Sequence, residues 1–194
     1  MKTRLIDEII DAEILEVPQK FRGFIRLDAD SQGWSRTLNY YGLSYAAAFE
    51  ELAETFLQNR GRREYLKIPL FYLCRHSVEL SIRSAMKDLH EAGFSCEEMS
   101  GHNLLALWEK FQSALKNTNL IENDDEWSEY CGRLIKHIHD FDPRGENFRY
   151  PVRKNGIPFS SADIEISHLI KAHFKIYGYC GAVGIMTDYL TDNH

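Results

Sequence analysis

The sequence predicts an all-α protein, folded as an up-and-down helical bundle of about five helices with a small irregular N-terminal extension. Two observations lead to this prediction. Apolar residues recur at spacings of three and four in five segments between Ser44 and Leu190, which is the period of a helix with one buried face. Glycine and proline residues separate these segments, and neither an internal repeat nor a long linker divides the chain.

Length and composition indicate a single globular domain. The 194 residues are 44% hydrophobic and 27% charged, which suits a chain that buries a core without disulfides or metal. We expect residues 1–40 to form the N-terminal extension, packed on the bundle, and residues 41–194 to form the bundle. Within the extension, residues 5–10 indicate a short helix and residues 21–27 a short strand.

The four cysteines are widely spaced and form no C-x-x-C pair, which argues against a zinc ribbon or a disulfide framework and favours a reducing compartment. The N-terminus is too acidic and too interrupted for a signal peptide. No apolar run approaches the roughly 20 residues that a membrane span needs. We therefore expect a cytoplasmic protein without a membrane partner.

The first bundle helix is expected from Ser44 to Asn59, with a break at Gly61. Its predicted buried stripe comprises Tyr45, Ala48, Phe49, Leu52 and Phe56. Pro69 suits the first turn of the second helix, which is expected to run to about His90.

The third helix is expected after Asn103, whose side chain suits an N-cap. The fourth is expected to begin near Asp124 or Asp125, because an acidic side chain stabilises a helix N-terminus. Asp142-Pro143 should end it.

A capping-box pattern, Ser160-x-x-Asp163, predicts the start of a long last helix. Its predicted core positions are Ile166, Leu169, Ile170, Phe174, Tyr177, Gly181, Val183 and Ile185. Gly178, Gly181 and Gly184 each cost about 1 kcal/mol of helix propensity. We expect them where another backbone packs close or where the helix kinks.

A polar stripe runs along one side of the second helix: Arg75, Glu79 and Arg83 are spaced four residues apart, and His76 lies beside them. It is either a solvated charge ladder or a partly buried row that lines a cleft and organises it. His102, in the turn before the third helix, is expected to satisfy nearby backbone groups. These five residues form the predicted structural polar cluster.

The end of the fourth helix carries the candidate catalytic residues Arg133, His137 and His139. Arginine fixes a phosphate and stabilises negative charge, while histidine takes or delivers a proton near neutral pH. Together they suffice for metal-free RNA cleavage, in which the 2′-hydroxyl attacks the neighbouring phosphorus. The alternative is that these histidines only complement the helix C-terminus. Paired ligand motifs are absent, so we predict no metal and no other cofactor.

The net charge of −6 argues against broad nucleic-acid binding, but residues 133–154 carry six Lys or Arg residues against three acids. An anionic ligand is therefore expected in this stretch. The predicted RNA or phosphate contacts are Arg144, Arg149, Arg153 and Lys154.

The segment Phe148-Arg149-Tyr150-Pro151 has two interpretations. Phe148 and Tyr150 could pack into the bundle while Arg149 reaches a carboxylate such as Glu79. Alternatively, an aromatic ring beside an arginine suits a stacked nucleotide and its phosphate.

Three motifs in this order resemble the HEPN superfamily of small bacterial helical domains. They are His76-x-x-Glu79-Leu80, Gly101-His102-Asn103-Leu104 and Phe148-Arg149-Tyr150-Pro151, within residues 65 to 155. The resemblance implies a helical bundle that forms a homodimer. It also implies a toxin or phage-defence setting with an antitoxin or defence partner.

Active members of this superfamily are metal-independent endoribonucleases with an R-x(4–6)-H motif, which Arg133 and His139 match. Leu134 departs from the pattern, because active members commonly have a polar residue there. The resemblance thus implies RNA cleavage by Arg133 and His139, with His137 as a substitute. The alternative is a non-catalytic module for dimerisation, or for binding a partner or nucleotide.

Overall fold

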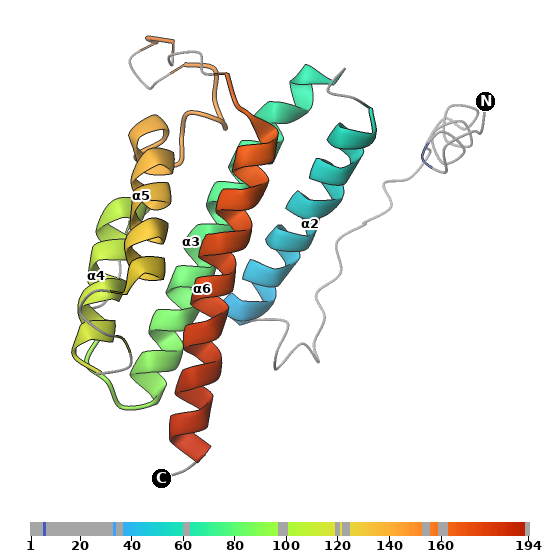
Figure 1. The fold of residues 1–194 in the computed structure, drawn as a ribbon. Coiled ribbons are helices and arrows are strands. Elements are labelled where there is room, and N and C mark those ends of the chain that lie inside the picture. Colours follow the sequence, from blue (N-terminus) through green and yellow to red (C-terminus); the bar gives the residue numbers. More distant parts are fainter. Residues whose placement is uncertain are drawn as a thin grey trace, which may run out of the picture. The chain divides into compact units, whose positions relative to one another are not determined.

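The predicted all-α bundle is confirmed by the computed structural model of the chain (Figure 1), whose described residues form five α-helices. They are α2 (Leu38–Gln58), α3 (Lys67–Glu91), α4 (Leu104–Lys116), α5 (Glu126–Phe141) and α6 (Ile166–Asp192), with a short 3-10 helix, η2 (Glu64–Leu66), before α3. The described residues include no strand, only an isolated antiparallel bridge between Val152 and Pro158.

The structure describes residues 6, 33, 37–59, 63–96, 101–118, 121, 125–152, 156–158 and 163–192. The chain divides into the units Met1–Gln32 and Gly33–His194, and all of the helices α2 to α6 belong to the second unit. Apart from the helical residue Ile6, the helix predicted at residues 5–10 and the strand predicted at residues 21–27 lie outside the described residues.

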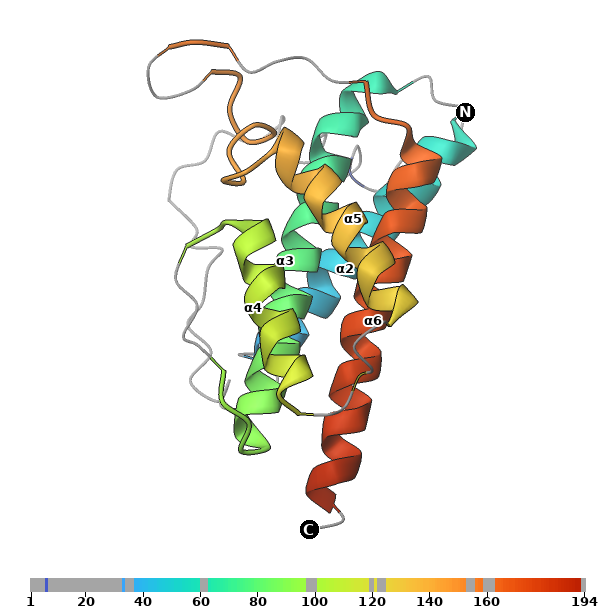
Figure 2. The same ribbon diagram turned by 60° about the vertical axis from the view of Figure 1, so that its left-hand side comes forward.

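Helix α3 lies at the centre and packs against α2, α4 and α6, while α5 packs against α4 and α6. Along the chain, α2 and α5 run in one direction and α3, α4 and α6 in the other, so α3 is antiparallel to α2 and parallel to its neighbours α4 and α6 (Figures 1 and 2). Arg75 and Arg83 of α3 donate to the carbonyls of His102 and Gly101, so α4 begins beside the middle of α3. This arrangement brings the turn before α4 against the polar stripe of α3.

Helix α2 begins at Leu38, earlier than the predicted Ser44, because the Thr37 hydroxyl accepts the Tyr40 N–H at 3.1 Å and caps it. Its buried stripe is Gly42, Ala46, Phe49, Ala53 and Phe56. The predicted burial of Ala48 is wrong, since this residue is exposed. The small residues of the stripe let α2 approach α3 closely.

The predicted N-caps of α4 and α5 are confirmed. Asn103 Oδ1 accepts the Ala106 N–H at 3.0 Å, and the Asp125 carboxylate accepts the N–H groups of Trp127 and Ser128 at 3.2 and 3.1 Å. These short-range bonds fix where each helix begins.

Three predicted core positions of α6 are wrong: Phe174 and Ile185 are 71% and 73% exposed, and Gly181 is also exposed. The buried face instead comprises Ile166, Leu169, Ala172, His173, Ile176, Tyr179, Cys180, Val183 and Thr187. The helix begins at Ile166, after Glu165, whose carboxylate accepts the Ser167 N–H at 3.2 Å. Ser160 of the predicted capping box lies outside the described residues.

The glycines of α6 do not mark a close backbone approach among the described residues. A Cβ built at Gly181 meets no atom within 4 Å, whereas one at Gly178 or Gly184 meets only a side chain. The prediction that another backbone packs against them is therefore wrong.

The four cysteines are free thiols. Burial raises the pKa of Cys131 and of Cys180 to about 12, so both remain protonated and unreactive at neutral pH. No helix in the described ranges is long and apolar enough to cross a membrane.

Candidate functional site

The polar stripe of α3 is buried at its centre. Arg75 is 3% exposed and Glu79 is 2% exposed. Glu79 Oε2 accepts a hydrogen bond from Arg75 Nη1 at 3.1 Å, and Glu79 Oε1 accepts two from Arg83, from Nε at 3.2 Å and from Nη2 at 3.1 Å. The sequence left open whether this row is a solvated charge ladder or a partly buried row. The structure shows that it is buried.

His102 completes this cluster from the turn before α4. Its Nδ1 lies 2.9 Å from Glu79 Oε1. Burial alone would raise the pKa of Glu79, but the hydrogen bond from His102 and the charges of Arg75 and Arg83 outweigh it and lower that pKa. Because an ionised carboxylate only accepts hydrogen bonds, we assign the proton to His102 Nδ1. In the neutral form of this imidazole, Nε2 is the nitrogen that carries the lone pair.

Arg75 joins the two segments that flank the site. Its Nη2 donates to the His102 carbonyl at 2.6 Å, and its Nε donates to the Asp142 carbonyl at 3.1 Å. Nε also lies 3.5 Å from the Asp142 carboxylate. One buried guanidinium thus fixes the turn before α4 and the turn after α5 to the same helix.

The turn after α5 is organised by Asp142, which is buried. Its Oδ1 accepts the N–H groups of Glu146 and Asn147 at 2.8 and 3.1 Å. Gly145 adopts a positive φ of 72°, and a Cβ there would lie 2.8 Å from Arg75 Nη1. The turn therefore requires glycine both for its backbone conformation and for its contact with Arg75.

We expect Gly145→Ala to lower the free energy of unfolding by about 2 to 4 kcal/mol, because it combines an unfavourable φ with displacement of Arg75. Gly156→Ala is the matched control: its φ is 79°, but a Cβ there meets no atom within 4 Å. It should cost only about 1 kcal/mol. Urea denaturation measures both, and equal losses would show that the contact with Arg75 has no energetic role.

The segment that follows packs on the bundle through Phe148. The ring of Phe148 lies on that of Phe71, with centroids 4.0 Å apart. Arg149 Nε donates to the Gly145 carbonyl at 2.6 Å, and its guanidinium carbon lies 5.7 Å from the centre of the Tyr72 ring. Arg149 therefore bonds to the Gly145 carbonyl and not to a carboxylate, as one interpretation of the sequence had expected. Tyr150 is exposed, so its predicted burial is wrong.

His76 does not join the cluster around Glu79. Its ring lies between two tyrosines, with centroids 4.4 Å from Tyr45 and 5.6 Å from Tyr72. Burial is the main cause that lowers its pKa. The structure thus brings together Arg75, Glu79, Arg83 and His102, and places His76 in an aromatic environment.

His102, His139 and Arg144 line one open cavity of about 520 Å³. Asn103, Pro143 and Glu146 complete its walls. The segments held by Arg75 form these walls. His139 Nδ1 is buried and has no hydrogen-bond partner among the residues that the structure describes. A buried N–H without an acceptor is costly, so we assign the His139 proton to Nε2.

Arg133 and His139 do not share this cavity. The Arg133 side chain is 68% exposed and lies on the outer face of α5, with Nη1 3.9 Å from Glu129 Oε2. Residues six apart on an α-helix lie roughly 120° apart around its axis. Within one chain, the structure therefore does not direct this predicted pair toward a common space.

His137 lies in a third place. It lines a separate groove, and its ring centroid lies 5.3 Å from that of Phe141. Of the predicted phosphate contacts, Arg144 is at the cavity and Arg149 is beside Gly145. Arg153 and Lys154 lie outside the described residues.

Sequence reasoning missed that His102 and His139 line one cavity. This placement depends on the turn before α4 lying near the turn after α5, which has no signature in residue spacing. Within the described ranges, no group of three or more His, Cys, Asp or Glu side chains could hold a metal ion.

Comparison of the chain with protein-family models, with curated proteins and with solved structures gives no match. The resemblance to the HEPN superfamily therefore stays a prediction.

Proposed function

We propose that the protein is a metal-independent endoribonuclease whose site is the cavity of His102, His139 and Arg144. The observation that carries this proposal is the placement of two imidazoles and a guanidinium on one open cavity. One imidazole is oriented by a buried carboxylate at 2.9 Å. A base oriented by a second group is a common arrangement in acid–base catalysis.

The assigned tautomers give the groups different roles. His102 Nε2 takes the proton of a 2′-hydroxyl, whose oxygen then attacks the adjacent phosphorus. Arg144 and the N–H of His139 Nε2 bind the non-bridging oxygens, where negative charge develops. The bond from phosphorus to the 5′-oxygen breaks, and the proton returns from His102 to that oxygen through cavity water. The products are a 2′,3′-cyclic phosphate and a 5′-hydroxyl.

The resemblance to HEPN ribonucleases supports the same class of reaction. The proposal keeps His139 but replaces Arg133 by Arg144 as the phosphate contact. A homodimer in which Arg133 of one copy meets His139 of the other is the competing arrangement. The two arrangements differ in whether His102 or Arg133 is required.

We expect the wild-type protein to cleave single-stranded RNA in EDTA. His102→Asn and Arg144→Ala should each reduce the rate at least about 100-fold, a typical loss for an acid–base or charge-stabilising group. Asparagine retains an N–H donor for Glu79, so the fold should persist. The measurement is the cleavage rate of a labelled RNA, with detection of cyclic phosphate ends.

Arg133→Ala and His137→Ala are the controls and should retain near-wild-type rates. Loss of activity in Arg133→Ala with full activity in His102→Asn would replace this site by the intermolecular one. If the wild-type protein cleaves no RNA, the remaining hypothesis is a non-catalytic module, in which the buried cluster is only structural.

A further inference from the structure

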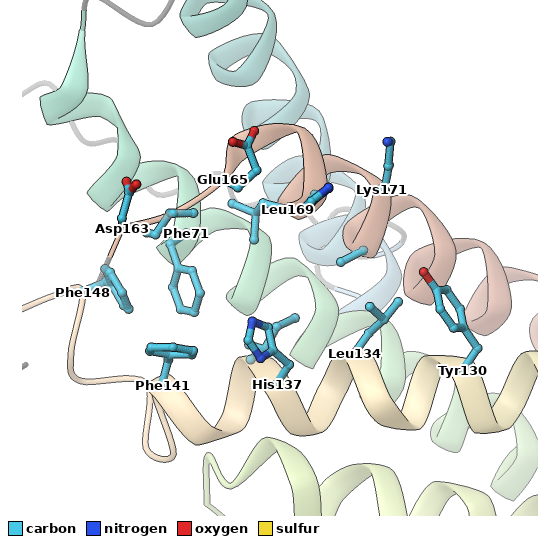
Figure 3. A pocket seen from close by; sticks show the side chains of 14 residues that line it. Phe71, Tyr130, Leu134, His137, Phe141, Phe148, Asp163, Glu165, Leu169 and Lys171 are labelled. Atoms are coloured by element: carbon cyan, nitrogen blue, oxygen red, sulfur yellow. The ribbon is translucent and has the colours of Figure 1, made fainter. Parts of the chain in front are cut away.

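Two further cavities of the bundle differ in how their carboxylates are satisfied. The groove beside His137 is lined mainly by apolar side chains (Figure 3). Its carboxylate Asp163 pairs with Lys67 at 2.9 Å. Its second carboxylate, Glu165, accepts the Ser167 hydroxyl at 3.0 Å, so both are engaged. The other cavity is smaller, about 190 Å³, and its carboxylates have no such partners among the residues that the structure describes.

This smaller cavity lies between the start of α2 and the C-terminal halves of α3 and α6, which meet at one end of the bundle (Figure 1). Small residues make up much of its wall: Gly42, Ser81, Ser84, Ala85, Gly181 and Gly184. No backbone of the described residues packs on Gly181 or Gly184, so these glycines keep the space open. We call it the acidic cavity, after the carboxylates of Asp88 and Asp188 that line it.

The acidic cavity contains a nearly buried hydroxyl without a partner. Ser84 is only 9% exposed, yet its side chain makes no hydrogen bond within the part of the chain that the structure describes. Ser81 on the same wall differs, because its hydroxyl donates to the Val78 carbonyl at 3.0 Å. Burying a hydroxyl without a bond is unfavourable, which indicates a polar occupant beside Ser84.

The two carboxylates of the acidic cavity lie on facing helices. A Cβ built at Gly184 would lie 3.4 Å from Asp88 Oδ2, so the Asp88 carboxylate of α3 reaches α6 at this glycine. Asp188 follows Gly184 by four residues, and residues at this spacing share one helix face. Both carboxylates are also near the C-terminal end of their helix, where the helix dipole disfavours a negative charge.

The neighbouring charges leave the acidic cavity negative. Burial raises the pKa of Asp88, and the charges of Asp188 and Glu91 raise it further. Lys87 acts in the opposite direction, but it is paired with Glu91 at 2.9 Å. Two carboxylates therefore face one space without a cation of their own.

Oxygen groups of this kind match a hard divalent cation. Mg²⁺ and Ca²⁺ take carboxylate, amide and water oxygens, and Mg²⁺ commonly binds through one or two carboxylates while it keeps several waters. The cavity of about 190 Å³ has room for such waters, each of which occupies about 30 Å³. Asn39 of α2 adds an amide oxygen at the rim.

We propose that the acidic cavity binds a hydrated divalent cation of the Mg²⁺ or Ca²⁺ class, with Asp88 and Asp188 as its carboxylate ligands. The Ser84 hydroxyl bonds to the water of the ion, and the ion joins the end of α3 to α6. Since the two carboxylates lie on different helices, no ligand spacing in the sequence indicates this site. No residue lines both this cavity and the proposed catalytic one, so the proposed RNA cleavage stays metal-independent.

Thermal unfolding of the full chain tests the site, after treatment with EDTA and removal of the chelator. We compare MgCl₂, CaCl₂ and spermidine with NaCl at the same ionic strength. For a Kd of about 1 mM, about 20 mM Mg²⁺ or Ca²⁺ should raise the melting temperature by about 4 to 7 °C. A rise with spermidine but with neither metal ion would replace the metal by an organic polyamine and overturn the proposal.

Variants locate the ion. Asp88→Asn and Asp188→Asn should each abolish the rise, and without ions neither should melt below the wild type, because each removes a carboxylate that its neighbour repels. Glu51→Gln is the matched control and should keep the full rise: it loses the same charge, but Glu51 is exposed on α2 and does not line the cavity. An equal rise in Asp88→Asn and Glu51→Gln would mean that the ions only screen the net charge, which overturns the site.

A direct measurement uses Mn²⁺, which takes the same oxygen ligands and is followed by electron paramagnetic resonance. We expect one Mn²⁺ per wild-type chain, displaced by excess Mg²⁺ or Ca²⁺ and lost in Asp188→Asn. Wild-type protein that binds no Mn²⁺ at millimolar concentration would overturn the proposal. Because RNA cleavage is not a readout here, neither result depends on the proposed nuclease.

Discussion

Glu79→Ala is expected to lower the melting temperature by about 6 to 20 °C. The substitution leaves the Arg75 guanidinium, which is 3% exposed, without its carboxylate partner. Removing one member of a buried ion pair costs about 3 to 5 kcal/mol. For a domain of this size, each kcal/mol shifts the melting temperature by roughly 2 to 4 °C. Thermal unfolding followed by circular dichroism measures the change.

Glu91→Ala is the matched control on the same helix. Glu91 pairs with Lys87 at 2.9 Å with the same spacing of four residues, but both side chains are exposed. Exposed pairs contribute at most about 1 kcal/mol. If Glu79→Ala were as stable as Glu91→Ala, the burial and bonding of the Arg75–Glu79 pair would make no contribution to stability.

Helix positions followed from the sequence where a local interaction defines them. Asn103 and Asp125 cap their helices through bonds to residues two or three positions later, so the signal lies within a few residues. The buried face of α6 was harder to predict, because its apolar residues occupy nearly all sides of the helix. Its period therefore did not reveal that His173 is buried while Phe174 is exposed.

The candidate site divides in the same way. The spacing of Arg75, Glu79 and Arg83 predicted that they share a face, but left open whether that face is buried. The answer depends on the His102 and Asp142 carbonyls, which come from distant segments and accept from Arg75. The placement of His102 and His139 on one cavity depends on the same two segments, so residue spacing alone could not predict it.

His173 makes the stability of the bundle depend on pH. It is buried on α6, its Nε2 lies 2.9 Å from Ser77 Oγ, and its ring lies 4.5 Å from Phe49 and stacks on Tyr177. Burial lowers its pKa from the ordinary 6.5 to about 4. No charged side chain is a cause of this change.

The direction of the effect follows from proton binding. Between about pH 6.5 and pH 4 the unfolded chain binds a proton at His173 that the folded chain excludes. The folded state is therefore favoured at higher pH and loses stability as the pH falls through this window. Since one pKa unit corresponds to about 1.4 kcal/mol, His173 should remove about 2 kcal/mol of stability between pH 7 and pH 5.

We expect His173→Phe to abolish this loss, whatever its effect on stability at pH 7. Ser77 remains satisfied in the variant, because its hydroxyl also donates to the Cys74 carbonyl at 2.9 Å. Urea denaturation at pH 7 and pH 5 gives the readout, with the exposed His90→Phe as the control. The lowered pKa of Glu79 and the raised pKa of Asp88 are common to all three proteins, so their contributions cancel. An equal loss in wild type and His173→Phe would mean that His173 is charged, or can become charged, inside the folded bundle.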